Sequence, residues 1–319
     1  MKKTDRILVT GASGFIGGQI MLALRDADHD VMGIDFNGLP HILKSVPNTF
    51  YQTGFSSSDG IAAMQEYQPD VIVYCAGTSL VGPSMRNPGL YYSNNATNTL
   101  ELMREICGTM PGTRVIFSSS AAVYGEPVIT PCSEVDPPMP VSPYGESKHM
   151  VEQMLAAYHH AHGLNYVAFR YFNVCGADSQ GRHGQTPTAT HIIARVLSAA
   201  KNNTEFVCNG NTYETPDGTC VRDYIHVEDI AQATLLALDS KIKSGIYNLS
   251  NGTGASNLDI IQLARTVTGC EIPVKFGPAR SGDPALLTGD SSKFREAAGW
   301  APRFTMTDSI EHAWRWRNV

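Results

Sequence analysis

The sequence lacks the features that would direct a protein to a membrane or to a nucleic acid. No run approaches the ~18 consecutive apolar residues that span a bilayer, and the mean hydropathy is −0.15. The chain is also short of positive charge, because 24 Lys and Arg stand against 30 Asp and Glu, for a net charge of −6 and a pI near 5.9. The basic residues are scattered rather than gathered in a stripe. We therefore expect no membrane partner and no nucleic-acid partner.

Cysteine and histidine are present, but in no arrangement that indicates disulfides or a metal. The seven cysteines are an odd number, widely spaced and free of paired metal-type motifs, which suits a reducing compartment. His149, His159, His160 and His162 lack a carboxylate or cysteine at ligand spacing, so no metal site is predicted. The first residues, 1–3, resemble the start of a secretion signal, but charged residues and glycines soon interrupt it. We expect a cytoplasmic protein.

Apolar runs that indicate buried strands alternate with helical patterns through the first half of the chain. The strand-like runs are 7–9, 31–34, 71–74, 115–117 and 166–170, and the clearest helical patterns are 94–106 and 146–162. This alternation predicts an α/β fold of the Rossmann type, with a doubly wound parallel sheet and helices on both faces. Ligands of such sheets bind beyond the carboxyl ends of the strands, where the strand order reverses.

Residues 10–17, Thr-Gly-Ala-Ser-Gly-Phe-Ile-Gly, follow the first strand and open a helix. Gly11 permits the tight turn, Gly14 lets the backbone approach a pyrophosphate, and Gly17 lets the helix pack closely on its strand. The helix N-terminus adds N–H groups and a partial positive charge. Asp35 ends the next strand, about 20 residues further on, where an acid binds ribose hydroxyls and repels a 2′-phosphate. The pattern predicts NAD rather than NADP, although a glycine turn and a strand-end acid also occur without a cofactor.

A second cluster predicts acid–base chemistry. Tyr144 and Lys148 are four residues apart at the start of a predicted helix and share one face. An ammonium beside a phenol favours the phenolate, so Lys148 together with a bound, positively charged nicotinamide is expected to lower the pKa of Tyr144 from ~10 toward neutrality. Residues 118–120, Ser-Ser-Ser, follow another strand and place hydroxyls at the carboxyl edge of the sheet. Each element is common alone, whereas together they predict a base, its activator and a hydroxyl partner, Ser120.

Further motifs extend this pattern along the chain. They are residues 118–125, 142–148, 170–173, 215–227, 280–284 and 290–293, with Gly299-Trp300. With the glycine turn, they resemble the extended short-chain dehydrogenase/reductases and, among these, the UDP-glucose (UDP-galactose) 4-epimerases, over nearly the whole chain. The resemblance implies NAD-dependent epimerisation at C4 of a UDP-sugar through a 4-keto intermediate, in galactose metabolism. It also implies a homodimer formed through the helices near 94–106 and 146–162.

The resemblance implies a role for individual residues as well. Tyr144 would be the catalytic base, Lys148 its activator and a ligand of the nicotinamide ribose, and Ser120 the hydroxyl partner. The NAD site would comprise Gly11, Gly14, Phe15, Ile16, Gly17, Asp35, Ala76, Gly77, Asn95, Ser118, Tyr144, Lys148 and Phe172. The substrate site would comprise Ser120, Tyr144, Asn173, His191, Arg222, Arg280, Asp283 and Leu287. Within it, Asn173, Arg222 and Arg280 would contact the diphosphate, and Asp283 a ribose hydroxyl.

After residue 172 the composition changes, which indicates a second domain. Residues 173–221 are rich in Gly, Asn, Thr and Pro, with one helical pattern near 191–200, whereas the helical pattern 227–238 is expected to return to the first domain. We predict an NAD-binding domain of residues 1–173 with about 222–245. Residues 174–221 and 246–319 would form a smaller mixed α/β domain that binds the nucleotide sugar. The aromatic and basic stretch 314–317 is expected to be a docked terminal helix.

Four positions depart from the pattern of the family that the chain resembles. Phe55 stands where an acid usually reads the adenine, and residues 78–79 lack a usual lysine. Asn209 replaces an aromatic or apolar residue that supports the uracil. Leu287 replaces a bulkier tyrosine, and its smaller side chain is compatible with an N-acetylated sugar.

Three related activities share parts of this pattern. A nucleotide-sugar 4,6-dehydratase has the same Tyr–Lys pair but carries acids after the strand-end hydroxyl, where this chain has Ala121-Ala122. A 4-epimerase of a UDP-N-acetylhexosamine or a UDP-pentose fits the same motifs. A non-catalytic NAD sensor generally loses the Tyr or the Lys, and this chain keeps both. If the resemblance is set aside, an ion pair with Asp223 or Asp283 explains the presence of Arg222 better than contact with a diphosphate does.

Overall fold

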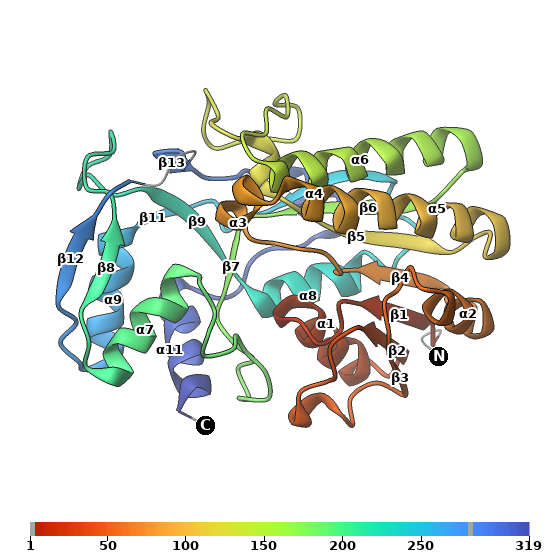
Figure 1. The fold of residues 1–319 in the computed structure, drawn as a ribbon, viewed down its shortest axis with the longest axis horizontal. Helices are drawn as coiled ribbons and strands as arrows, with labels where there is room; N and C mark the ends of the chain where they lie inside the picture. The colour runs from red at the N-terminus through yellow and green to blue at the C-terminus, as the bar shows by residue number, and fades with distance from the viewer. Residues whose placement is uncertain (1–3, 280–282, 319) are drawn as a thin grey trace.

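The computed structural model describes residues 4–279 and 283–318, which form a seven-stranded parallel sheet with a smaller part beside it (Figure 1). The strand order is β10–β6–β5–β4–β1–β2–β3, so the order reverses between β1 and β4. The strands are β1 (Arg6–Thr10), β2 (Asp30–Asp35), β3 (Thr49–Gln52), β4 (Val71–Tyr74), β5 (Arg114–Ser120), β6 (Tyr166–Tyr171) and β10 (Gly245–Leu249). The predicted fold class is confirmed, and all five predicted strands lie in this sheet.

Alternate residues of the strands feed two separate apolar cores, as expected for a sheet that is covered on both faces. In β1, Ile7 and Val9 join a core with α1 and α8, whereas Leu8 joins a core with α2, α5 and α6. Figure 1 shows α5 and α6 on one side of the sheet and α1 and α8 on the other. These helices are α1 (Phe15–Asp26), α2 (Ser58–Tyr67), α5 (Asn98–Thr109), α6 (Pro143–His162) and α8 (Val227–Leu236).

Between β4 and α5 the chain forms two short helices, α3 (Val81–Arg86) and α4 (Pro88–Tyr91), and then a π-helical turn, Tyr92–Thr97. The helix predicted at 94–106 is therefore part π-helical turn and part α5. Asn95, a predicted cofactor residue, lies in this turn and is buried. Such turns occur often at functional sites because they re-aim side chains within a helix.

The smaller part has its own sheets and its own core. Its four-stranded sheet consists of β7 (Asn173–Cys175), β9 (Val221–His226), β11 (Gly254–Ser256) and β13 (Leu286–Leu287). β8 (Phe206–Asn209) pairs with β12 (Val274–Gly277). A third apolar core joins α7 (Ile192–Asn202), α9 (Asn257–Thr268) and α11 (Met306–Arg317), which Figure 1 shows beside these strands.

The sheets do not follow the predicted domain boundaries at two points. The smaller domain was expected to resume at residue 246, but β10 pairs in parallel with β6 and is the outermost strand of the large sheet. β9 pairs with β7, β11 and β13, so the segment predicted to rejoin the first domain from 222 begins in the smaller sheet. In addition, α10 (Ser292–Ala298) contributes Phe294 to the core of the large sheet. A division that follows the sheets places 221–226 with the smaller part and 245–249 with the larger.

The C-terminal stretch forms the predicted docked helix, α11. Trp314 packs against the third core, and the indole nitrogen of Trp316 donates to the carbonyl of Gln185 at 2.9 Å. The exposed Arg315 donates to a backbone carbonyl of Ser179. No helix among the described residues is long and apolar enough to cross a membrane. All seven cysteines are free thiols.

Candidate active site

The glycine turn joins β1 to α1 in the way that a dinucleotide phosphate requires. Gly11 has a φ of +69°, and a Cβ there would lie 2.7 Å from the backbone nitrogen of Ala76. A Cβ on Gly17 would overlap the carbonyl oxygen of Gly11, so α1 packs directly on the turn. Gly14 is the N-cap of α1 and no side chain caps the helix. The first N–H groups, which begin at Phe15 and Ile16, therefore point out of the helix end and fit a pyrophosphate.

Asp35 lies at the end of β2, beside the glycine turn. Its two carboxylate oxygens accept hydrogen bonds from the backbone N–H groups of Ser13 (3.0 Å) and Asn37 (2.8 Å). Each oxygen retains a second lone pair for a ribose hydroxyl, so the turn and Asp35 together fit the adenosine half of NAD. Phe55, where an acid was expected from the resemblance, is buried with its ring against Tyr74 at 5.2 Å between centroids.

Asn95 links the loop after β4 to α6. Its side-chain oxygen accepts from the backbone N–H of Thr78 at 2.8 Å, and its amide nitrogen donates to the hydroxyl of Ser147 at 2.9 Å. Gly77 has a φ of +149°, and a Cβ there would lie 2.9 Å from Asn95 Oδ1 and 3.7 Å from Lys148 Nζ. The loop after β4 therefore passes close to Lys148, which brings these three predicted cofactor residues together.

Tyr144 and Lys148 lie in the first two turns of α6. The helix begins here because the hydroxyl of Ser142 accepts from the N–H of Gly145 at 3.2 Å and Pro143 occupies the first position. Both side chains are buried, as is the rest of this helix face.

The end of β5 holds the two side chains. Lys148 Nζ donates to the carbonyl oxygen of Ser118 at 2.8 Å, and the hydroxyl of Ser120 hydrogen-bonds the phenol of Tyr144. The same ammonium lies 4.8 Å from the ring centroid of Phe117 and 6.0 Å from that of Tyr144. The structure therefore brings the predicted Tyr144, Lys148 and Ser120 together at the carboxyl edge of the sheet.

Burial dominates the electrostatics of this group in the chain by itself. Burial raises the pKa of Tyr144, and the neighbouring Tyr91 raises it further. The hydrogen bond from Ser120 acts in the opposite direction and lowers this pKa. Burial also lowers the pKa of Lys148 to about 8, although Cys75 and Glu152 oppose that shift. The lowering was expected from Lys148 and a bound nicotinamide together, so it stays a prediction for the loaded site, whereas in the chain by itself the pKa of Tyr144 is raised. In the chain by itself both groups are buried, and the ammonium lies against the carbonyl of Ser118 rather than against the phenol.

The predicted substrate residues come from the smaller sheet. Asn173 begins β7, and Leu287 in β13 is the parallel neighbour of Arg222 in β9. The guanidinium of the buried Arg222 lies 3.6 Å from the carboxylate of Asp283. The ion pair considered for Arg222 on its sequence alone is thus present with Asp283, whereas Asp223 accepts from backbone N–H groups. The structure brings Arg222, Asp283 and Leu287 together.

Of the remaining predicted residues, Phe172 adjoins this group, because it shares a small buried cluster with Leu287 and Tyr124. His191 is the exposed N-cap of α7, and within the described residues no hydrogen bond or ion pair joins it to another predicted site residue. Arg280 lies outside the described residues. Across residues 4–279 and 283–318, no group of three or more His, Cys, Asp and Glu could hold a metal ion.

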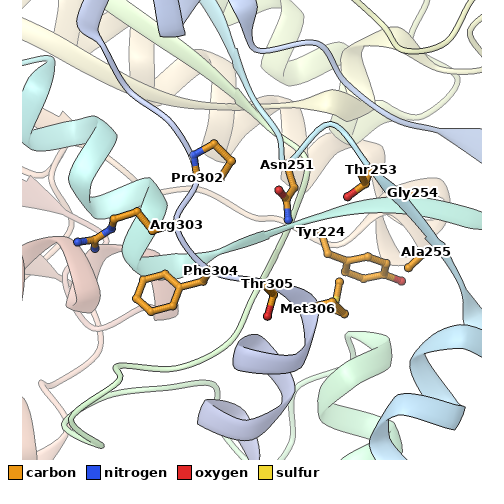
Figure 2. A pocket seen from close by; sticks show the side chains of 10 residues that line it. All are labelled: Tyr224, Asn251, Thr253, Gly254, Ala255, Pro302, Arg303, Phe304, Thr305 and Met306. Carbon is orange, nitrogen blue, oxygen red and sulfur yellow. The ribbon is translucent and has the colours of Figure 1, made fainter.

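A cavity of about 380 Å³ lies elsewhere, between β9, β11 and the segment that enters α11 (Figure 2). Its walls include Tyr224, Asn251 and Phe304, and in Figure 2 the guanidinium of Arg303 points away from Tyr224. None of its lining residues is a predicted site residue. The cavity is therefore separate from the Tyr144 group.

A buried ion pair next to Lys148 was missed from the sequence. Glu152, one helical turn after Lys148, receives two hydrogen bonds from Arg170 in β6. The available signal was the continuation of the Tyr144–Lys148 spacing by four more residues. Arg170 is the first residue of the motif 170–173, but nothing in the neighbouring sequence indicates that it pairs with Glu152.

A glycine turn for a dinucleotide phosphate, an acid for a ribose and a Tyr–Lys–Ser group share one edge of the large sheet. Together they define the class of the protein, a doubly wound α/β enzyme that uses a nicotinamide dinucleotide.

Comparisons with known proteins narrow this class. The model of the NAD dependent epimerase/dehydratase family matches residues 7–250. The UDP-glucose 4-epimerase of Halalkalibacterium halodurans is 39% identical over 317 residues, which are 97% of this chain and 95% of that protein. The crystal structure of UDP-glucose-4-epimerase from Stenotrophomonas maltophila, with bound NAD and formylated UDP-arabinopyranose, has a TM-score of 0.92 at 31% identity over 98% of both chains. That of the Bifidobacterium longum enzyme, in complex with NAD+ and UDP, has a TM-score of 0.91 at 32% identity, also over 98% of both chains. The chain belongs to the NAD-dependent epimerase/dehydratase family.

Proposed function

We propose that the protein is a UDP-glucose 4-epimerase, which uses bound NAD to invert C4 of a UDP-sugar. One observation carries the proposal: the buried phenol of Tyr144 is hydrogen-bonded by Ser120 and lies one helical turn from the ammonium of Lys148. This group stands at the sheet edge that also carries the glycine turn and Asp35. Relatives matched over nearly their full length carry the same activity in their names.

The reaction needs a base, a hydride acceptor and room for the sugar to present its other face. When bound, NAD supplies the chemistry of accepting a hydride from the sugar C4 and returning it. Tyr144 removes the proton from the 4-hydroxyl and returns it to the epimer. The hydrogen bond from Ser120 favours the ionised phenol and brings a second hydroxyl to the same substrate oxygen. Lys148, held on Ser118, places a positive charge one turn away and favours the ionised phenol when the site is complete.

For the nucleotide part of the substrate, we assign the diphosphate to Arg222, Arg280 and Asn173 and a ribose hydroxyl to Asp283. A guanidinium matches phosphate oxygens as a forked donor. In the chain alone Arg222 is paired with Asp283, so a diphosphate would replace a carboxylate at the same guanidinium. His191 and Leu287 complete the proposed sugar-side lining.

For the cofactor, we assign the pyrophosphate to the first turn of α1, from Gly11 to Gly17, and the adenosine ribose to Asp35. The nicotinamide half would lie along Ala76, Gly77, Asn95, Ser118 and Phe172, with its ribose on Tyr144 and Lys148. The assignment is supported by the close approach of Gly77 to Lys148 and Asn95, which leaves backbone rather than side chain at that point.

The test is to incubate the purified protein with UDP-galactose and separate the products by chromatography. Formation of UDP-glucose is the expected result. A 4-keto-6-deoxy product would instead identify a 4,6-dehydratase, which is disfavoured because Ala121 and Ala122 supply no acid after Ser120. Binding of NAD with no interconversion of any nucleotide sugar would identify a sensing protein and overturn the proposal.

A second candidate substrate class is an N-acetylated UDP-hexose or a UDP-pentose. The observation that favours the N-acetylated sugar is Leu287, a side chain of modest size that is buried beside Arg222. Parallel assays of UDP-galactose, UDP-N-acetylgalactosamine and UDP-arabinose would rank these substrates by kcat/KM.

We further propose a cytoplasmic homodimer with a role in galactose metabolism. The free state of the seven thiols suits a reducing compartment. Support for the dimer is the set of exposed apolar side chains on α3, α4 and α5, namely Met85, Leu90 and Leu100. Light scattering coupled to gel filtration checks the dimer, and a mass near 34.6 kDa would contradict it.

A further inference from the structure

The end of β5 and the first turns of α6 are joined by a repeated set of hydrogen bonds. Three consecutive strand residues bind three helix residues that are each four positions apart and share one face. The pairs are Ser120 with Tyr144, the carbonyl of Ser118 with Lys148, and the hydroxyl of Ser119 with Glu152. Two of these helix residues are the base and its activator in the proposed reaction, and the third has no part in the chemistry.

Glu152 is the most strongly held of the three. Its side chain is 1% exposed, and it accepts from Ser119 Oγ at 2.6 Å, from Arg170 Nε at 2.9 Å and from Arg170 Nη2 at 2.7 Å. Ser119 in β5 and Arg170 in β6 are register neighbours, so the carboxylate spans two strands. The guanidinium of Arg170 in turn lies 4.7 Å from the ring centroid of Tyr124. The clamp formed by Ser119, Glu152 and Arg170 therefore fixes α6 both along its axis and about it.

Stability alone is a weak reason for such a group. Removing a carboxylate and a guanidinium from water costs about as much as their attraction returns, and apolar side chains of similar volume often stabilise a core equally well. Directional hydrogen bonds, in contrast, fix a helix in one register. A displacement of about 1 Å in a reacting group costs about 100-fold in rate, and one residue of helix is a rise of about 1.5 Å with a rotation of about 100°.

We propose that Glu152 is a positioning residue, which holds α6 at the height and rotation that bring Tyr144 and Lys148 onto Ser120 and Ser118. This inference rests on the proposed epimerase function for its kinetic consequence, but its structural consequence is independent. When the clamp is broken, α6 shifts and the hydrogen bond from Ser120 to Tyr144 weakens. Because that bond lowers the pKa of Tyr144, its loss raises the pH at which the phenolate forms.

The test compares Glu152→Gln with a variant that loses a different buried carboxylate and with two variants of Ser119, one of which keeps the hydroxyl that binds Glu152. Asp229→Asn is the matched control, since Asp229 is an equally buried carboxylate that accepts from the backbone N–H groups of Arg303 and Phe304 in the C-terminal segment. Ser119→Ala removes a single hydrogen bond from the clamp, and Ser119→Thr keeps the hydroxyl. All are measured as the NAD-loaded enzyme, well below their melting temperatures. The readouts are kcat and KM for UDP-galactose and the ultraviolet absorbance of the Tyr144 phenolate, isolated as the difference from the same protein with Tyr144→Phe.

We expect Glu152→Gln to lower kcat by about tenfold or more while KM changes by less than about threefold, and to move phenolate formation to higher pH. Ser119→Ala should lower kcat and raise the pH of phenolate formation to a smaller degree, and Ser119→Thr should restore the wild-type value of each. Asp229→Asn should lower the melting temperature and leave kcat and phenolate formation unchanged. Wild-type kcat and an unmoved phenolate in Glu152→Gln would overturn the proposal, as would an equal loss of kcat in Asp229→Asn. Should Glu152→Gln fail to fold, Ser119→Ala decides by the same two readouts. Absence of epimerase activity in the wild type would refute the proposed function, and the phenolate titration would still decide the role of Glu152.

Discussion

At the scale of single residues, Tyr144 and Lys148 face opposite demands from burial and from chemistry. Burial raises the pKa of Tyr144 and lowers that of Lys148 to about 8, and both shifts favour the neutral forms. The proposed reaction instead needs the phenolate as base and the ammonium beside it. The hydrogen bond from Ser120 to the phenol and the carbonyl of Ser118 on the ammonium act against burial. Holding Tyr144 and Lys148 in their ionised forms in this buried site therefore lowers the stability of the fold, and the bound ligands must offset that loss.

Removal of the phenolic oxygen is expected to stop the reaction without emptying the cofactor site. Tyr144→Phe should lower kcat by at least about 100-fold, the usual share of a general base, and leave the affinity for NAD largely unchanged. Stopped assays of UDP-galactose conversion and a titration with NAD measure the two effects. Tyr158→Phe, a partly buried tyrosine further along the same helix, is the control and should keep full activity. Unchanged turnover in Tyr144→Phe would remove this residue from the mechanism.

Replacement of Lys148 by a neutral side chain of similar length should stabilise the protein while inactivating it. The folded pKa of Lys148, about 8, lies below its ordinary value of 10.5, so between these pH values the native chain binds fewer protons than the unfolded chain. The wild type therefore gains stability as pH rises through this window, and below it bears the full cost of the buried ammonium, roughly 3 kcal/mol at most. Lys148→Met should melt at a higher temperature than the wild type at neutral pH.

The same reasoning sets the control for this prediction. The advantage of Lys148→Met should shrink as the pH is raised from about 8 toward 10.5, because the wild-type lysine then loses its charge. Melting temperatures by circular dichroism across this range measure it. A difference between the two proteins that stays constant with pH would contradict the assigned pKa.

The residues found from the sequence are those whose partners lie at short and regular spacings. Tyr144 and Lys148 are one helical turn apart, and Ser118 to Ser120 follow a clear strand, so their proximity was predictable. The pair of Glu152 and Arg170 was not, because its members meet only when α6 packs on β6. Spacing also says nothing about burial, which raises the pKa of Tyr144 in the chain by itself.

At the scale of elements, the glycine turn depends on the absence of side chains. Gly17 faces the carbonyl oxygen of Gly11 without room for a Cβ, so any side chain there must move α1 away from β1. Gly17→Ala should destabilise the fold by about 1–3 kcal/mol and weaken NAD binding, because the displaced helix end no longer meets the pyrophosphate. Thermal melting and NAD titration measure these effects.

A glycine in an open position serves as the control for this substitution. Gly108 lies in the last turn of α5 with open space where a Cβ would stand. Gly108→Ala should raise stability by about 0.5–1 kcal/mol, the ordinary gain of alanine in a helix, and leave NAD affinity unchanged. If Gly17→Ala and Gly108→Ala had the same effect on stability and on NAD affinity, the close packing of α1 at Gly17 would not be what these two properties depend on.

Element prediction succeeded where a buried strand is a continuous apolar run, and it missed strands that lack such a run, among them the exposed β3. The runs 7–9 and 71–74 are apolar throughout because both faces of these strands are covered. β3 (Thr49–Gln52) is the exposed edge strand, with Thr, Tyr and Gln in its sequence, and shows no apolar run. The π-helical turn at 92–97 has no signature in a periodicity that assumes 3.6 residues per turn.

At the scale of the whole molecule, the chain crosses between its two parts more often than composition suggests. Residues 221–226 begin in the smaller sheet, residues 245–249 return to the large one, and Phe294 and Trp300 pack beneath it. A boundary drawn from composition misses these crossings because pairing partners, rather than neighbours in sequence, decide where a strand lies. The crossings place the proposed substrate residues of β7, β9 and β13 beside the carboxyl edge that carries Tyr144.

The C-terminal helix is tied across the molecule to the start of α1, and this link yields a last prediction. The indole of Trp316 in α11 packs on His183 with ring centroids 6.3 Å apart and donates to Gln185. A ring nitrogen of His183 lies 3.0 Å from the carbonyl oxygen of Phe15, the first residue of α1. Trp316→Ala should therefore lower stability by about 2 kcal/mol or more and weaken NAD binding several-fold, although Trp316 is not itself a proposed ligand contact. Arg315→Ala, which loses only an exposed bond to Ser179, should change stability by less than about 1 kcal/mol. Melting curves recorded with and without saturating NAD separate the two effects, and an unaltered NAD-induced shift in Trp316→Ala would show that α11 stabilises the fold without reaching the cofactor turn.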